Sequence, residues 1–245
     1  MSGHSKWSTI KRKKGETDAQ RGKIFTKISR EISVAVKEGG PDPSSNAKLR
    51  DLIAKAKSNN VPNDNVDRAI KKAAGDGDKN NYETIVYEGY GPQGVAVIVE
   101  ALTDNRNRTA GDVRHYFDKF GGNLGTNGCV SYLFQEKGII IIENSAIKDQ
   151  DQLLEDAIEV GANDISFEAE FAEVDTDSTA LRQVREGLEQ KGYVLASAEV
   201  EKIPETYATI SDEEAALKME KLLEMLEDHD DVQNVWHNWE QPTEE

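Results

Sequence analysis

The chain has 245 residues and a formal net charge of −16, with 30 Lys and Arg against 46 Asp and Glu. This length allows one to three domains with real hydrophobic cores. No apolar run approaches the roughly 18 residues that a membrane-spanning helix needs, and the basic start lacks the apolar stretch of a secretory signal. Cys129 is the only cysteine, so no internal disulfide is possible and we expect a cytoplasmic protein.

Charge is unevenly distributed along the chain. Residues 1–80 carry 18 Lys and Arg against 10 Asp and Glu, whereas the rest has a net charge of −24. A basic segment on an acidic body is typical of proteins that bind nucleic acid or an anionic surface. The alternative is a solvated basic surface without a binding role.

Residues 17–75 are predicted to form a three-helix bundle. Apolar residues recur at helical spacing over 24–36. Two shorter helices are expected to follow, one capped near Ser45 or Asn46 and one opening at Pro62. Short amphipathic helices are stable only when their apolar stripes pack against one another or against a partner.

A polar, Gly-rich stretch over 75–81 is predicted to be a linker. The periodicity then changes from helical to alternating. The pattern predicts strands over 84–87 and 95–102, a helix that ends at 121–122, and a strand over 129–134.

From Gly138 the pattern is regular and predicts the order β-α-β-β-α-β, which is a ferredoxin-like unit. A final helix and strand follow this unit. The predicted elements are strand 139–143, helix 149–160, strands 164–168 and 172–176, helix 178–191, strand 194–201, helix 212–227 and strand 232–237.

The segment 82–134 has too few elements to complete a sheet, and the final helix and strand can supply the missing ones. We therefore predict an α+β fold: an N-terminal three-helix bundle followed by two α/β-sandwich-type domains, the last ferredoxin-like and inserted into the middle one. The predicted domains are a basic helical domain over 1–78, a central α+β domain over 82–134 plus 206–239, and the inserted α+β domain over 138–203.

The opening stretch, residues 3–14, is basic, contains one aromatic residue and has little apolar content. Lys and Arg in such a segment can displace counterions from phosphates, and Trp7 can stack on an exposed base. The basic character continues into the first helix; a solubilising tail is the alternative. The candidate nucleic-acid-binding residues here are His4, Lys6, Trp7, Lys11, Arg12, Lys13, Lys14, Arg21, Lys23, Lys27 and Arg30.

Arg106 and Arg108 lie where a strand turns into a helix, in a body that has few other bases. Two arginines at a helix N-terminus can form an anion site. Capping of that helix by Asn105 or Asn107 is the purely structural explanation of the same run. We add both arginines to the candidate nucleic-acid-binding residues.

Two Gly-rich runs resemble nucleotide-binding loops without their context. Residues 89–94 match G-x-G-x-x-G, but a strand-like run follows where a helix is needed, and Pro92 removes an amide donor. Residues 121–128 lack the Lys-Ser/Thr ending and the following helix of a phosphate loop. A hairpin turn and a structured helix-to-strand turn are the expected structures.

No catalytic constellation is visible. The four histidines lack metal-ligand spacing, Cys129 lies in an apolar run typical of a core thiol, and no pair of carboxylates stands out. The run 228–231 is expected to be a solvated turn and not a cation site. We therefore predict a protein that is not an enzyme, with no catalytic residue, metal or cofactor.

Five runs of this sequence resemble the YebC/PmpR family, and the resemblance spans nearly the whole chain. They are Gly3–Trp7, Arg21–Lys27, Tyr87–Pro92, Thr103–Thr109 and Gly121–Gly125.

The resemblance implies a helical N-terminal domain and two α+β domains, one inserted in the other. Family members are described mostly as DNA-binding transcriptional regulators. Mitochondrial relatives are translational activators, and bacterial ones are linked to the ribosome and to relief of elongation stalls. Cys129 stands where many relatives have serine, which argues against an essential hydroxyl there.

Two functions follow as expectations. The first is a non-enzymatic, DNA-binding regulator of transcription, in which a bundle helix enters a major groove. The alternative is a ribosome-associated translation factor whose basic N-terminus contacts ribosomal RNA. The charge distribution favours the second and the family description the first. The expected partner is DNA or ribosomal RNA, with the ribosome as a further candidate, and neither a membrane nor a small-molecule substrate.

Overall fold

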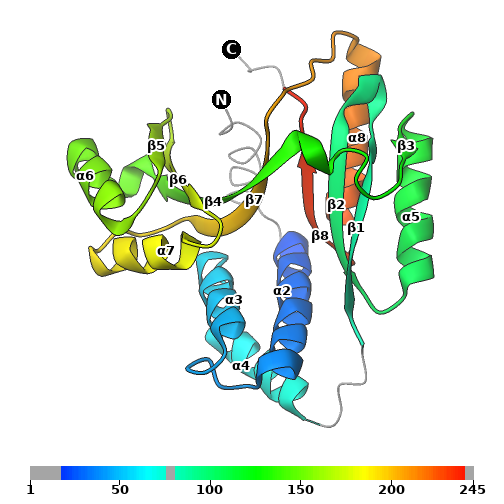
Figure 1. Ribbon diagram of the computed structural model, residues 1–245. Helices are drawn as coiled ribbons and strands as arrows, with labels where there is room; N and C mark the ends of the chain where they lie inside the picture. Colours follow the sequence, from blue (N-terminus) through cyan, green and yellow to red (C-terminus); the bar gives the residue numbers. More distant parts are fainter. Residues whose placement is uncertain (1–17, 76–80, 241–245) are drawn as a thin grey trace.

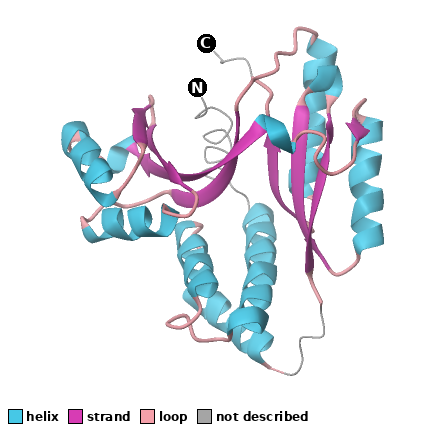
Figure 2. Cartoon of the chain, viewed as in Figure 1, coloured by secondary structure: helices cyan, strands magenta, loops and turns pink. Residues whose placement is uncertain are grey.

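The computed structural model describes residues 18–75 and 81–240 (Figure 1). A group of N-terminal helices lies beside two four-stranded antiparallel sheets (Figure 2), which confirms the predicted α+β class. No helix within these two ranges is both long and apolar enough to cross a membrane. The predictions for residues 1–17 and 76–80 lie outside the described residues.

The N-terminal helices form a three-helix bundle with a core of its own, as the periodicity predicts. Ile28, Ile32 and Leu49 are fully buried in this core. Asn46 joins two of the helices, because its side chain accepts from the Leu49 amide at 3.0 Å and donates to the carbonyl of Ala35 at 2.7 Å. The helices are α2 (Asp18–Gly39), α3 (Ala47–Ser58) and α4 (Asn63–Ala74).

The first sheet has the strand order β3-β1-β2-β8. Helices α5 and α8 cover one face of it, where Phe117 and Met219 pack on the inward side chains of β2. The last strand reaches β2 from far along the chain and pairs Val97 with His237. The elements are β1 (Glu83–Tyr90), η1 (Pro92–Gly94), β2 (Ala96–Thr103), α5 (Arg106–Lys119), β3 (Asn123–Leu124), α8 (Glu213–Asp228) and β8 (Val232–His237).

The predicted strand over 129–134 is wrong. A single turn of 3-10 helix, η2 (Ser131–Leu133), occupies half of this run. The backbone N–H groups of Val130 and Ser131 donate hydrogen bonds to the Glu88 carboxylate. In a strand, such groups would donate to a neighbouring strand instead. The apolar side chains of the run instead cover the second face of the first sheet.

The second sheet has the order β5-β6-β4-β7, and its elements follow the predicted β-α-β-β-α-β order. Helices α6 and α7 cover one face through Leu153 and Leu188. Four consecutive isoleucines, 139–142, are buried on the two faces of the central strand. The elements are β4 (Phe134–Glu143), η3 (Asn144–Ala146), α6 (Gln150–Val160), β5 (Asp164–Phe167), β6 (Phe171–Asp177), α7 (Leu181–Gln190) and β7 (Ser197–Pro204).

Figure 1 shows the helical bundle seated below both sheets, with the top of α2 near the first sheet and the top of α3 near α7. In sequence, the second sheet lies wholly between β3 and β8. The predicted domain boundaries and the insertion remain predictions.

Candidate nucleic-acid interface

The candidate cations with described side chains occupy two places in the fold. Lys23, Lys27 and Arg30 lie on α2, and Arg106 and Arg108 lie in the first turn of α5. Arg21 belongs to α2, but its side chain is outside the described part. Also outside the described residues are His4, Lys6, Trp7, Lys11, Arg12, Lys13 and Lys14.

The three α2 cations share one helix face, since residues three and four apart are neighbours on a helix. We call Lys23, Lys27 and Arg30 the basic face. The basic face lies against residues 227–231, where α8 ends and β8 begins. Four of these five residues are acidic, and we call this segment the acidic turn. The nucleic-acid role of the basic face stays a prediction, because its cations here pair within the protein.

Each cation of the basic face has an oxygen partner in the acidic turn. Lys23 Nζ lies 3.0 Å from Asp228 Oδ1, and Lys27 Nζ donates to the carbonyl of Glu227 at 2.7 Å. That carbonyl is in the last turn of α8, where a helix leaves acceptors free and its dipole favours a cation. Burial lowers the pKa of Lys27 to about 8 although the carboxylates of the acidic turn raise it.

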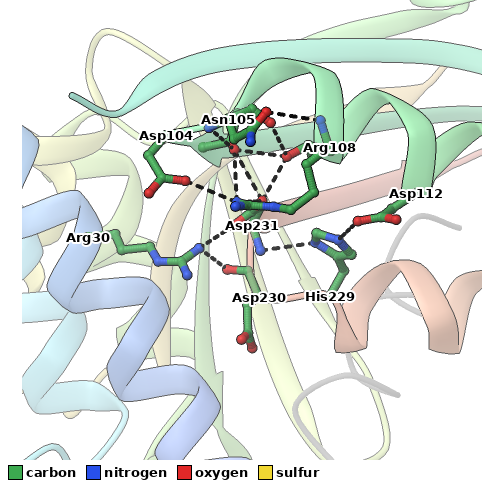
Figure 3. Close-up of polar contacts among 10 residues, drawn as sticks. Arg30, Asp104, Asn105, Arg108, Asp112, His229, Asp230 and Asp231 are labelled. Atoms are coloured by element: carbon green, nitrogen blue, oxygen red, sulfur yellow. Dashed lines mark hydrogen bonds and ion pairs between the residues drawn. The ribbon is translucent and has the colours of Figure 1, made fainter. Parts of the chain in front are cut away.

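Arg30 makes the deepest contact of the basic face (Figure 3). Its Nη1 donates at 2.6 Å both to the Asp230 carbonyl and to Asp231 Oδ1. The side chain of Asp231 is only 4% exposed. A charge so buried is stable only with several close partners, and Asp231 has partners from three elements.

On its other oxygen, Asp231 binds the first sheet and α5. Oδ2 accepts from Arg108 Nη2 at 2.7 Å, from Thr109 Oγ1 at 2.7 Å and from Thr103 Oγ1 at 3.1 Å. Burial disfavours the charged form, but the hydrogen bonds from Arg108, Thr109 and Arg30 outweigh it and lower the pKa of Asp231 to about 2. The carboxylate thus joins α2, β2 and α5 at one point.

Arg106 and Arg108 differ in the structure. Arg108 also pairs with Asp104 at 3.0 Å, and its backbone N–H is capped by Asn105 Oδ1 at 3.1 Å. Its side chain is therefore a structural connector as well as a candidate contact. Arg106 is 67% exposed and lies 3.7 Å from Glu83, so it is the freer of the two for an external anion.

The prediction of a solvated turn over 228–231 is wrong for Asp231, which is buried, whereas Asp228 and Asp230 are exposed. His229 Nδ1 accepts from the Asp231 amide at 3.1 Å, and His229 Nε2 lies 3.2 Å from Asp112 Oδ2. Burial of Asp231 against Arg30 and Arg108 closes the turn, a contact that no local pattern encodes. Among the described residues, no group of three or more His, Cys, Asp or Glu side chains is arranged to hold a metal ion.

The first Gly-rich run forms the expected hairpin turn, whereas the second contains a short strand, β3, before its turn. Residues 89–94 form the β1–β2 hairpin, with Tyr90 opposite Ala96. The run 121–128 leads from α5 through β3 into a turn held by Glu88, whose carboxylate accepts from the amides of Gly128, Val130 and Ser131 at 2.8–2.9 Å. The Glu88 carboxylate therefore already occupies the place where these amides would bind an external anion. Burial raises the pKa of Glu88, but the hydrogen bonds from the backbone amides outweigh it and lower the pKa.

A second set of ion pairs attaches α3 to the other sheet. Asp51 accepts from Arg182 Nη2 at 2.6 Å and from Arg185 Nη1 at 3.0 Å, both on α7. Lys55 lies 3.2 Å from Glu31 and 3.8 Å from Glu199 on β7. These groups border a cleft of about 670 Å³ between the bundle and both sheets.

Two models of known protein families match this chain. A family model described as "TACO1/YebC second and third domain" matches residues 82–239, and one described as "TACO1/YebC protein N-terminal domain" matches residues 5–76. The chain belongs to the TACO1/YebC family. This confirms the resemblance inferred from the sequence motifs.

Relatives of this TACO1/YebC member match it along nearly its whole length. A protein of Acetivibrio thermocellus is 60% identical over 239 residues, covering 98% of this chain and 99% of the relative. One of Finegoldia magna is 57% identical over 240 residues, with the same coverages. Both are named "Probable transcriptional regulatory protein". The crystal structure of "a Conserved Hypothetical Protein Aq1575 from Aquifex Aeolicus" aligns with a TM-score of 0.84 at 49% identity, covering 94% of both chains.

The sequence pattern does not reveal the partners of the N-terminal helices. It places Asp231, which receives Arg30, in a solvated turn, and it gives no signal for Asp51 and Lys55, which contact the second sheet and its helix α7. Arg30 and Asp231 are 201 positions apart, and Asp51 and Arg182 are 131 apart. The one available signal was the concentration of acids at 227–231 in a chain whose bases gather on the first helix.

Proposed function

We propose that this chain is a non-enzymatic, nucleic-acid-binding regulator of gene expression in the cytoplasm, acting first of all as a DNA-binding regulator of transcription. The observation that carries the proposal is the alignment of Lys23, Lys27 and Arg30 on one face of α2. In the sequence, these cations follow the basic leader, residues 3–14. The names of the relatives from Acetivibrio thermocellus and Finegoldia magna support the regulatory role.

A ribosome-associated translation factor that binds ribosomal RNA is the second candidate. A helix that reads DNA needs polar side chains free to enter the major groove, whereas the cations of the basic face point to the acidic turn. The net charge of −24 after residue 80 would also oppose a long duplex lying along the body. Both features favour a short contact made by the basic leader 3–14.

We also propose that the domains follow the boundaries expected from the sequence. The pairing of β8 with β2 supports a central domain built from 82–134 and 206–239. The strand order β5-β6-β4-β7 supports a ferredoxin-like domain over 138–203, inserted between those two parts.

Neutralising the leader tests the phosphate contact. In a variant with Lys11, Arg12, Lys13 and Lys14 changed to Ala, affinity for nucleic acid should fall and its salt dependence should flatten by about three to four units of log–log slope. The matched control changes four exposed cations elsewhere to Ala: Lys57, Lys71, Lys72 and Lys221. An affinity and slope equal to those of this control would refute the leader contact.

The choice of partner needs a separate measurement. Titration of one duplex DNA pool and one ribosomal RNA fragment, with sedimentation of lysate through a sucrose gradient at low and high salt, compares the two candidates. Much tighter binding to one DNA site than to random DNA supports the transcriptional role. Co-sedimentation with ribosomal subunits that is lost at high salt supports the translational role.

A further inference from the structure

We propose that the acidic turn is a built-in competitor for phosphate: it occupies the basic face of α2, so that nucleic acid binds this face only when the turn is displaced. This inference rests on the proposed nucleic-acid function. It adds that the conformation described here is the closed, low-affinity form of that site.

The chemistry of the contact resembles that of a phosphate contact. Lys23 and Arg30 each meet a carboxylate oxygen, and Lys27 meets a carbonyl oxygen, at 2.6–3.0 Å. Lysine and arginine use the same donors and similar distances for phosphodiester oxygens. A nucleic-acid backbone that approached these cations would therefore have to replace the oxygens of the acidic turn or share the cations with them, against the repulsion of its carboxylates.

The acidic turn is held in a fixed position for this contact. Arg108, Thr103 and Thr109 bind the carboxylate of Asp231 from the side of the first sheet, and His229 accepts from its amide. These bonds do not involve α2. The turn therefore keeps its shape when α2 leaves.

The docking of α2 depends on polar contacts. The bundle core is built from residues of α2, α3, α4 and the segments that join them, and the core beneath α5 and α8 contains none of them. The Lys23–Asp228 pair is partly exposed, at 40% and 60%, so salt weakens it, whereas the Arg30–Asp231 pair is buried. Interfaces within a chain that have no shared apolar core are commonly mobile. A polyanion can thus compete effectively where a packed apolar interface would resist it.

The second attachment of the bundle leaves the basic face free to open. Asp51 and Lys55 contact α7 and β7 and use none of the candidate cations. Because α2 and α3 share one core, α2 leaves the acidic turn by movement of the whole bundle against the first sheet, and the α3–α7 contact can keep the bundle attached to the second sheet.

The test removes the exposed charges of the acidic turn and spares the buried one. Asp228 and Asp230 are exposed, and both raise the pKa of Lys27 through their charge. The variant Asp228→Asn/Asp230→Asn is compared with Glu220→Gln/Glu224→Gln, which removes two exposed charges from α8, outside the acidic turn. Both are made in the full chain, so the net charge is the same in the two proteins.

Affinity is measured for two probes, a mixed-sequence 20-nucleotide single-stranded RNA and a 20-base-pair DNA duplex. The distance between α4 and α8 is followed by energy transfer between dyes at Lys72→Cys and Lys221→Cys in a Cys129→Ser background. We expect the acidic-turn variant to bind at least one probe about 3- to 10-fold more tightly than the control, and the dye distance to increase when that probe is added.

The outcomes separate the two proposals. If the probes bind both variants equally and the dye distance stays constant at saturation, competition is refuted while nucleic-acid binding stands. If neither probe binds the unmodified chain or any variant, the proposed function itself is refuted, and competition falls with it. A longer dye distance on binding, with tighter binding of the acidic-turn variant, supports both.

Discussion

Removing the charge of Asp231 should destabilise the protein in a way that depends on pH. The isosteric change Asp231→Asn keeps the shape of the side chain but leaves Arg30 and Arg108 without their shared anion. The difference between the usual pKa of 3.8 and about 2 in the folded chain corresponds to about 2 kcal/mol at neutral pH. Because the side chain is 4% exposed, we expect a loss of about 2–4 kcal/mol.

The sign of the pH dependence follows from the direction of the shift. A carboxyl whose pKa is depressed by folding stabilises the folded state above its unfolded pKa of about 4, and this contribution disappears as the pH falls towards the folded value. The free-energy difference between wild type and Asp231→Asn should therefore be full at pH 7 and shrink by about 2 kcal/mol between pH 4 and pH 2.

Urea unfolding followed by tryptophan fluorescence measures this difference, because Trp236 lies in β8 of the first sheet and Trp239 is buried in the core beneath that sheet. Asp118→Asn, an exposed carboxylate on α5, is the matched control. A loss below about 0.5 kcal/mol at pH 7, or one of equal size at pH 7 and pH 3, would show that the buried carboxylate does not stabilise the fold as argued.

Two other predictions concern single side chains. Glu88→Gln should lower the free energy of unfolding by about 1–3 kcal/mol, because an amide group cannot accept from all three backbone N–H groups. Urea unfolding measures this loss, with the exposed change Glu205→Gln as the control. Equal stabilities of the two variants would show that the Glu88 carboxylate does not stabilise this turn. Nucleic-acid binding near pH 9 should take up protons, because the pKa of Lys27, about 8 when buried against the acidic turn, should rise towards about 10.4 once the side chain reaches water. Calorimetry in two buffers of different ionisation enthalpy detects the uptake, Lys27→Arg should abolish it, and the same uptake in that variant would assign the proton to another group.

Local periodicity was enough to predict most elements of this fold. The three bundle helices, the β-α-β-β-α-β order of the second sheet and the last strand at 232–237 were all visible as apolar patterns. The run 129–134 failed because its alternation is overridden by Glu88, a residue some forty positions earlier whose carboxylate captures the amides. Pattern reports which side chains are apolar, but not which distant group takes a backbone hydrogen bond.

The candidate site was predicted only as charges, without their partners. Composition located the cations on the first helix and the acids late in the chain. It could not pair Arg30 with Asp231, because that contact depends on the packing of α8 and β8 onto the first sheet. The prediction therefore described a free basic surface, whereas the folded chain presents that surface already neutralised by its own acids.

The late position of β8 has a consequence for synthesis of the protein. The bundle uses contacts between residues close in sequence, so it can fold as soon as it leaves the ribosome, whereas β2 waits for a strand about 130 residues further on. Until then, β2 has an open edge and Arg30 has no buried anion. The nascent chain therefore exposes its cations early and covers them last, and a ribosome paused before residue 227 would carry a chain whose basic face has no acidic turn to meet.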